Sequence, residues 1–360
     1  MKKAVELKGL PPGELYSRFT GRKALFIFAS LALLAVVALV ATSLGGASLG
    51  IGDVFRAVIA GPPSSAEGSV DLDRVIVWHL RLPRIVMGII AGAGLAVAGA
   101  AMQGVLRNPL VSPFTVGVSS GATLGASIAI ILGFGLVGSA RYVVIANAFV
   151  FAMGTAFLIL AIGRLRGITP ESFILVGIAL MYFFGAFTSL LQYIATEEEL
   201  SEVIHWAFGS LTGSSWGNIG IVSAMMLGCL PPLLKYSWDL NAMAQGGDEV
   251  AQSLGVNCGR VRVVCMALAS LITASIVCFT GLIGFVGLVA PHISRLLIGG
   301  DHRYLLPASA VLGAILLLTA DTIGRTIVSP TIIPVGIVIS FIGAPFFLYL
   351  SITRRRQYWQ

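Results

Sequence analysis

Apolar residues gather into ten long runs that are separated by short polar or charged segments. The runs cover residues 24–44, 85–106, 114–136, 142–163, 172–194, 217–234, 263–281, 283–298, 304–322 and 332–351. About 20 apolar residues are needed to cross the ~30 Å hydrocarbon core of a bilayer as a helix. Helix is the expected structure, because lipid offers no partner for unpaired backbone groups. The pattern predicts an all-α polytopic membrane protein with ten transmembrane helices.

The composition supports the same class. Of the 360 residues, 57% are hydrophobic and 11% are charged, whereas an ordinary soluble domain carries about 25% charged residues. A chain with so few charges cannot cover a water-exposed surface, so membrane lipid is its expected surrounding. The net charge of +7 then reflects orientation in the bilayer and predicts no nucleic-acid partner.

The segment 263–294 decides the number of spans, because it contains no Asp, Glu, Lys or Arg. As a single helix it would be ~48 Å long, well beyond the hydrocarbon thickness. Gly281, Gly284 and Gly287 lie where a tight reversal would need them. With two helices there, 17 of the 23 Lys and Arg residues lie on the N-terminal side of the membrane, and with one helix only 13 do. The positive-inside rule favours ten spans with both termini in the cytoplasm.

These spans predict a cytoplasmic tail at 1–23, a single ten-helix membrane domain at 24–351 and a cytoplasmic tail at 352–360. The first run is too long for the apolar core of a signal peptide, so we expect it to be retained. The longest cytoplasmic connection covers 235–262. Helices 2–5 and 7–10 have opposite orientations in this topology, which allows an inverted repeat.

The sequence offers no constellation for catalysis, metal binding or nucleotide binding. Its four cysteines and four histidines lack metal-ligand spacing, and we expect the cysteines to be core residues. No lysine follows a glycine, so the sequence contains no P-loop. We therefore expect no cofactor in this chain, and any ATP and Mg²⁺ that drive transport would be bound by a partner subunit.

A strip of small residues follows one face of the second span. It consists of Gly88, Gly92, Ala96, Ala100 and Gly104. Small residues at every fourth position let a second helix approach closely, which is how helices pack where lipid removes the hydrophobic drive. We interpret the strip as a packing surface inside the bundle.

The long cytoplasmic connection contains a pattern typical of a short helix. The pair Gly246–Gly247 breaks the chain, and Asp248 and Glu249 follow where a helix start favours negative charge. Ala251 through Leu254 fits a helical turn that Gly255 closes. A solvated loop and a docking helix for a cytoplasmic partner both fit these residues.

Two arginines, Arg81 and Arg84, flank Pro83 at the outer end of the second span. Arginines beside a span are least expected on that side of the membrane. Snorkelling to the interface and binding of an external partner fit these residues equally well.

Several segments together resemble the permeases of ABC importers for ferric siderophores, haem and cobalamin. They are "RLPRIVMGIIAGAGLAVAGAAMQGVLRNPLVSPFTVGVSSGA" (81–122), "HWAFGSLTGSSW" (205–216), "GDEVAQSLGV" (247–256), "GLIGFVGLVAPHISRLLIGGDHRYLLP" (281–307), "ADTIGR" (320–325) and "IPVGIVISFIGAPFFLYL" (333–350). The resemblance covers the chain from about residue 24 onward, in the family's order. It implies a cell-membrane homodimer with two cytoplasmic ATPase subunits and an extracytoplasmic solute-binding protein.

The resemblance also implies roles for individual residues. Arg81, Arg84 and Arg325 match arginines that bind acidic residues of the binding protein. The segment 247–256 matches the helix that couples the permease to its ATPase, through Gly247, Asp248, Glu249, Ala251, Ser253, Leu254 and Gly255. Thr169 and Ser172 fall at the turn where the family has its cytoplasmic gate.

We therefore predict a non-enzymatic permease subunit that imports a metal chelate by alternating access. Ferric siderophore is the first expected cargo, followed by haem and then cobalamin, and an apolar pathway suits such bulky chelates. The alternative is a stand-alone secondary transporter with inverted repeats, which needs a charged coupling site in the bilayer. The only acids near span ends are Glu171 and Asp321. A membrane-embedded enzyme is a third class, and the sequence shows no reactive group for it.

Overall fold

A computed structural model of the chain describes residues 12–45, 49–63, 71–134, 140–165 and 169–353. Every secondary-structure element in this part of the chain is helical, as predicted. The elements are α2 (Pro12–Ser43), α3 (Ile51–Ala60), α4 (Leu72–Val75), the π-helical turn η2 (Ile76–Arg81), α5 (Leu82–Leu106), α6 (Val118–Leu132), α7 (Ala140–Leu165), α8 (Pro170–Ile194), α9 (Glu197–Ala207), α10 (Trp216–Lys235), α11 (Ser237–Ser253), α12 (Cys258–Thr280), α13 (Val286–Ile298), α14 (His302–Thr326) and α15 (Val335–Thr353).

Within these residues, seven helices are long and apolar enough to cross a membrane. They are Thr20–Ser43, Leu72–Leu106, Tyr142–Gly163, Pro170–Ile194, Trp216–Lys235, Cys258–Thr280 and His302–Thr326. Three shorter apolar helices, Val118–Leu132, Val286–Ile298 and Val335–Tyr349, lie in the other three predicted runs. Each of the ten runs therefore contains one apolar helix, although the shortest, α13, is only ~20 Å long.

The charge-free segment 263–294 forms two helices, as predicted. Gly281 turns the chain with a φ of 68°, and a Cβ there would clash with the backbone carbonyl of Trp206. Gly284 also lies in this reversal, although it is not among the residues with positive φ. Phe285 adopts the second positive φ, 59°, and Gly287 lies inside α13.

Two predicted boundaries also differ from the structure. The first helix begins at Pro12, so residues 12–23 extend the first span as helix. Most of the connection 235–262 is helical as well, because α11 occupies it. The predicted tail segments at 1–11 and 354–360 lie outside the described residues.

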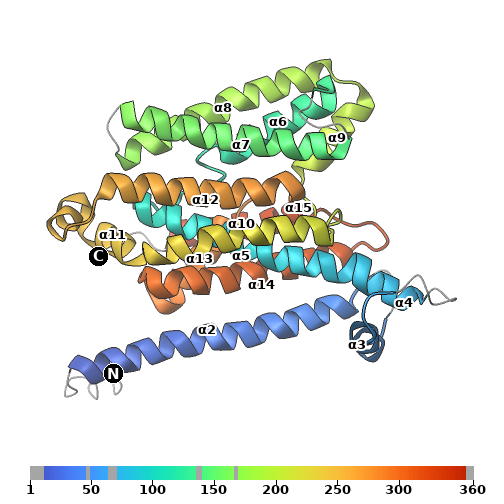
Figure 1. Cartoon of the computed structure of the whole chain (residues 1–360), viewed down its shortest axis with the longest axis horizontal. Helices are drawn as coiled ribbons and strands as arrows, with labels where there is room; N and C mark the ends of the chain where they lie inside the picture. The colour runs from blue at the N-terminus through green and yellow to red at the C-terminus, as the bar shows by residue number, and fades with distance from the viewer. Residues whose placement is uncertain (1–11, 46–48, 64–70, 135–139, 166–168, 354–360) are drawn as a thin grey trace.

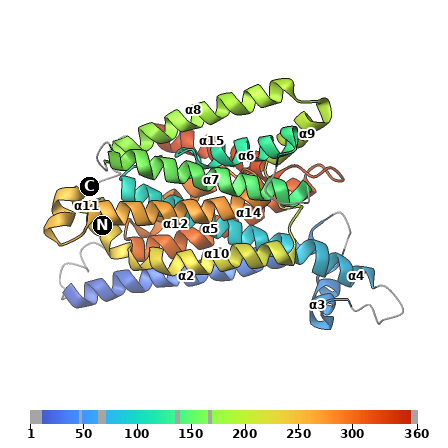
Figure 2. The same ribbon diagram turned by 45° about the horizontal axis from the view of Figure 1, so that its top comes forward.

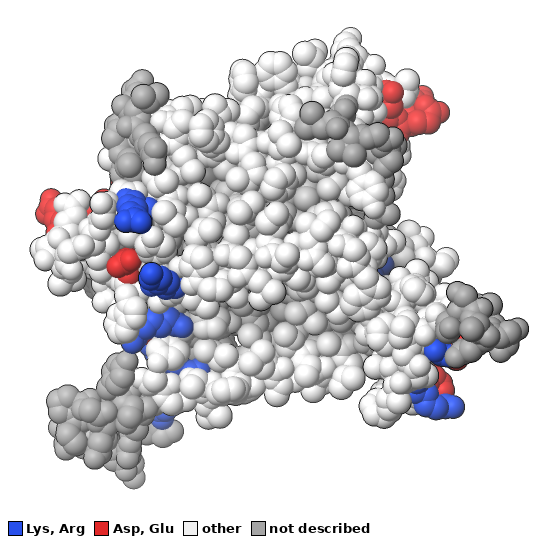
Figure 3. All heavy atoms as spheres, in the orientation of Figure 1, with Lys and Arg blue, Asp and Glu red and all other residues white. Residues whose placement is uncertain are grey.

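The helices form one bundle around α5, whose residues are mostly buried against α12, α13 and α14. Figures 1 and 2 place α2 and α8 at opposite edges of this bundle. One end of the bundle carries α11, and the other carries α3, α4 and α9. Between the charged side chains of the two ends, the visible surface is a broad band without Lys, Arg, Asp or Glu (Figure 3). Such a band fits the hydrocarbon core of a bilayer.

Candidate functional site

The second half of α11 is set off from the first by a sharp break at Gly247. Gly247 has φ 74° and ψ 179°, a backbone conformation that is essentially restricted to glycine. Gly255, with φ 86°, follows the end of this half. We call residues 248–255, the helical turns to Ser253 with the two residues that close them, the coupling helix, after the role that the resemblance implies. The sequence predicted a helix at Ala251–Leu254, and the structure starts it three residues earlier and ends it at Ser253.

One buried arginine anchors the coupling helix to the bundle. Arg262 of α12 donates hydrogen bonds from Nη2 to both carboxylate oxygens of Asp248, at 3.0 and 2.9 Å. Arg262 is only 1% exposed, and the Asp248 carboxylate compensates its buried charge. Sequence reasoning counted Arg262 only as a cytoplasmic positive charge, since its 14-residue separation from Asp248 matches no local helical spacing.

The rest of the coupling helix divides into a buried and an exposed face. Ala251 is fully buried against the bundle. Leu254 and Val250 are 69% and 49% exposed at the end of the molecule, and Glu249 and Ser253 are exposed beside them. The helix therefore presents apolar side chains at the end of the bundle, beyond the apolar band, which suits a protein partner.

The two predicted gate residues form the start of α8. Thr169 is the N-cap, and its Oγ1 accepts a hydrogen bond from the Ser172 backbone N–H at 3.3 Å. A polar pocket of about 380 Å³ separates this helix start from the Gly247 break. Arg107, Glu171 and Gln245 are among the residues that line it. Pro170 and Glu171, from the helix start, and residues 244–247 line the pocket, whereas the gate candidates Thr169 and Ser172 are not among its lining residues.

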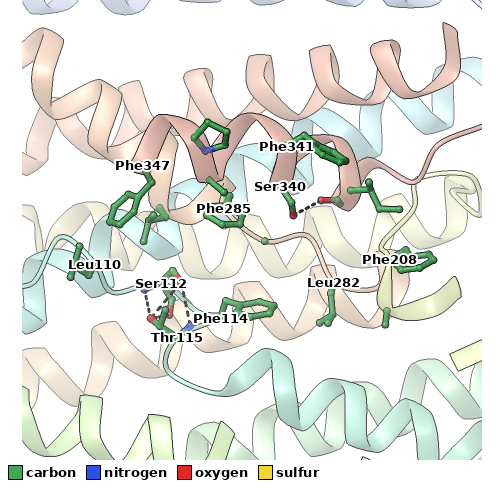
Figure 4. A pocket seen from close by; sticks show the side chains of 17 residues that line it. Leu110, Ser112, Phe114, Thr115, Phe208, Leu282, Phe285, Ser340, Phe341 and Phe347 are labelled. Carbon is green, nitrogen blue, oxygen red and sulfur yellow. Dashed lines mark hydrogen bonds between the residues drawn. The ribbon is translucent and has the colours of Figure 1, made fainter. Parts of the chain in front are cut away.

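A larger cavity of about 870 Å³ runs along one side of the bundle. Figure 4 shows Phe114, Phe285 and Phe341 around it, from the connection after α5, the connection after α12 and α15. None of the described residues that line it is charged. Its side-chain hydroxyls are engaged locally, as Ser340 Oγ donates to the Gly336 carbonyl at 2.8 Å. The cavity lining is therefore uncharged and mainly apolar, and it offers a solute few polar partners.

The three arginines that the resemblance assigns to docking lie at the end of the bundle away from α11, and two of them bind one carboxylate. Arg84 Nε lies 3.0 Å from both carboxylate oxygens of Asp321, and Arg325 Nε lies 3.2 Å from one of them. Arg325 also donates to the carbonyls of Ala41 and Leu44, and Arg81 donates to those of Thr42 and Ser43. We call Arg81, Arg84, Asp321 and Arg325 the arginine cluster.

The cluster ties the end of α2 to α5 and α14. The last carbonyls of a helix lack intrahelical partners and carry partial negative charge, so arginines there are stabilising. Arg81, Arg84 and Arg325 are 5%, 8% and 8% exposed. In this arrangement their guanidinium groups bind acceptors within the same chain. Contact with a binding protein, which the resemblance implies, stays a prediction.

The strip of small residues on α5 lies against α14 for part of its length. Gly92 contacts the backbone of Gly313, and Gly104 contacts the ring of His302. The sequence pattern did not indicate a second close approach. Gly99, on another side of α5, lies against the backbone of Gly287 on α13. Among the residues that the structure describes, no three His, Cys, Asp or Glu side chains are grouped to hold a metal ion.

Comparison with known proteins identifies the family. The FecCD transport family matches residues 33–353. The chain belongs to the FecCD transport family. A Methanocaldococcus jannaschii protein named as an ABC transporter permease is 45% identical to this FecCD chain over 343 residues, covering 93% of the chain and 96% of that protein. The Fe(3+)-citrate import system permease protein YfmE of Bacillus subtilis is 42% identical over 321 residues, covering 88% and 93%.

A solved structure shares the fold. It is described as an inward-facing conformation of a metal-chelate type ABC transporter, and it is 33% identical with a TM-score of 0.79. The match covers 91% of this FecCD chain and 99% of that one. The resemblance read from the motifs is therefore confirmed, and this FecCD chain is a multi-pass membrane permease of an ABC importer.

Proposed function

We propose that this permease imports a metal chelate through a pathway enclosed by two copies of the chain, with ATP hydrolysed by separate subunits. The observation that carries the proposal is the coupling helix. It is rigidly anchored by the Asp248–Arg262 pair and presents the exposed side chains of Val250 and Leu254 outside the apolar band. These are the properties expected of a helix seated in a cleft of an ATPase.

The proposed topology has ten crossings, with the α11 end in the cytoplasm and the α3 and α9 end outside. Seven long and three short apolar helices support that number. The positive-inside bias of the sequence supports the orientation. The extracytoplasmic binding protein would then reach the end that carries the arginine cluster, and alternating access would open the cavity to each side in turn.

A ferric chelate is the first proposed cargo, and haem and cobalamin are the alternatives. The names of the citrate permease and of the solved metal-chelate transporter support this class. The uncharged cavity of about 870 Å³ supports a bulky solute over a small bare ion, which would need charged or polar ligands.

Co-expression with candidate ATPase and binding-protein subunits tests the proposal. The complex is purified through a tag on this chain, and uptake of ⁵⁵Fe-labelled ferric chelate into proteoliposomes is measured with and without ATP. We expect stoichiometric ATPase and ATP-dependent uptake. Leu254→Asp should lose the ATPase, and the control Arg56→Ala, an exposed residue of α3 at the other end of the bundle, should retain it. Uptake without ATP by the chain alone would instead support a secondary transporter.

A further inference from the structure

The short helix α3, between the first span and the second, has a stripe of exposed apolar side chains. Ile51, Phe55 and Ile59 are 71%, 64% and 70% exposed. Their four-residue spacing places them on one face of the helix. Exposed apolar side chains in such a row need a partner that removes them from water.

The other faces of α3 are already occupied. Val54 and Ala57 are 6% and 3% exposed and belong to a small core that includes Val77 of η2. Asp53 and Arg56 form an ion pair of 2.6 Å on the exposed side away from the apolar stripe, and the Arg56 side chain is 81% exposed. The helix is therefore amphipathic, with a polar face that water can solvate and an apolar face that requires an apolar partner.

The position of α3 indicates what covers the stripe. Figure 1 shows α3 nearly end-on while the spanning helices are seen from the side, so α3 lies across their direction. It follows the C-terminal end of α2, where the apolar band ends (Figures 1 and 3). Leu39, Val40 and Leu44, near that end of α2, are exposed apolar side chains as well.

Two tryptophans mark the same level of the bundle. Trp78 Nε1 donates to the Ala57 carbonyl at 3.0 Å, and Trp216 Nε1 donates to the Trp78 carbonyl at 2.9 Å. The ring centroids are 6.1 Å apart. Tryptophan is enriched where the headgroups meet the acyl chains, because one side of the indole is apolar and the other donates a hydrogen bond.

We propose that α3 is an in-plane membrane helix, with Ile51, Phe55 and Ile59 inserted among the lipids at the headgroup boundary and Asp53 and Arg56 facing water. An amphipathic helix of this form lies in the interface plane with its apolar face buried in lipid. The assignment to the outer leaflet rests on the proposed function. Through Val77 and Trp78, the lipid-bound helix holds η2, and with it Arg81 of the arginine cluster.

Spin labels on single introduced cysteines test this in the full chain. All four native cysteines are at most 3% exposed, which leaves the introduced one accessible. The chain is reconstituted in nanodiscs of phosphatidylcholine and phosphatidylglycerol. Collisions are measured with oxygen, which enters lipid, and with a water-soluble nickel chelate. We expect labels in Phe55→Cys and Ile59→Cys to favour oxygen severalfold relative to labels in the controls, Asp53→Cys and Arg56→Cys.

Equal ratios at all four positions would overturn the proposal, as would shielding of Phe55→Cys from both reagents, which indicates cover by protein. A second measurement tests the orientation of the chain separately from lipid contact. A membrane-impermeant thiol reagent is applied to sealed vesicles. If lipid contact is found but Arg56→Cys reacts only from the cytoplasmic side, the in-plane helix stands and the proposed orientation fails.

Discussion

At the scale of single residues, Asp321 is the carboxylate on which the arginine cluster depends. Arg84 and Arg325 lie within 3.2 Å of it, and it is only 1% exposed. Removing one partner of a buried ion pair leaves an uncompensated charge. The sequence could not predict this pairing, because 237 residues separate Arg84 from Asp321 and neither position alone indicates the other.

Asp321→Ala should therefore lower stability by about 3–5 kcal/mol, because Arg84 stays buried without its bidentate partner. Thermal unfolding in detergent measures the loss. Arg56→Ala is the matched control, since this arginine is exposed and its pair with Asp53 should contribute less than about 1 kcal/mol. Equal melting temperatures for the two variants would contradict the structural role of the cluster.

The charge-swapped variant Arg84→Glu/Asp321→Arg separates folding from docking. It keeps one carboxylate in the cluster but sets the new arginine beside Arg325, so it should recover part of the stability lost in Asp321→Ala, while it reverses the charge at position 84. If Arg84 also contacts the binding protein, the swapped permease should bind that protein at least tenfold more weakly, as measured by surface plasmon resonance. Unchanged affinity in a stable variant would limit Arg84 to its role inside the chain.

Asp301, the N-cap of α14, provides a pH-dependent contribution to stability. Burial alone raises the pKa of its carboxyl, but hydrogen bonds from Arg303 and Asn241, with the Arg303 charge, outweigh this and lower the pKa to about 2. Because the folded pKa lies below the ordinary 3.8, the contribution is present above pH ~4 and is lost as the pH falls towards 2. Asp301→Asn keeps an N-capping side chain. Its melting temperature should fall below that of the wild type at pH 6, and the difference should shrink below pH 4.

At the scale of elements, the thickness of the bilayer explains why the ten apolar helices could be predicted. It does not determine where each helix begins and ends. The bilayer fixes the length of apolar helix that is needed, but polar residues can extend a helix beyond it, as at 12–23. Parts of the runs that contain α6 and α13 are not helical. Their connections carry Phe114 and Phe285, which line the cavity. Non-helical backbone at membrane depth is tolerated where it lines a cavity, and hydropathy does not reveal cavities.

The coupling helix was predicted from residue types, but its anchor was not. Glycine, acidic residues and a closing glycine are local signals, so the segment 247–255 could be recognised from the sequence. Its attachment through Arg262 is a tertiary contact. The sequence therefore predicted the position of the coupling helix, but it did not predict that the buried Arg262 holds this helix against the bundle.

Removing that anchor should uncouple the ATPase. Asp248→Ala removes the carboxylate that binds the buried Arg262, so we expect lower stability together with weaker ATPase association. Asp248→Ala/Arg262→Met also removes the buried charge and should recover stability, while the coupling helix still lacks its anchor. ATP hydrolysis by the reconstituted complex should remain reduced in the double variant. Full recovery of hydrolysis would show that the ion pair acts only through stability.

At the scale of the whole molecule, the single chain does not fully enclose the cavity beside α15. The cavity is bordered by α15, where Phe341 is 77% exposed, and α8 has exposed aromatic side chains such as Tyr182 and Phe183. Lipid can cover apolar side chains, but a transport pathway cannot stay open to lipid along its length. A second copy of the chain on this side would close the cavity, and α2, at the opposite edge from α8, would remain against lipid (Figures 1 and 2).

Cysteine cross-linking in native membranes tests this arrangement. We expect Phe341→Cys to form a covalent dimer with a short bis-maleimide linker, because the α15 helices of two copies would face one another across the pathway. Phe28→Cys, on α2, is 70% exposed and serves as the lipid-facing control. A dimer from Phe28→Cys and none from Phe341→Cys would place the interface on the other edge of the bundle. The cavity beside α15 would then open to lipid, and the proposed pathway would have to be abandoned.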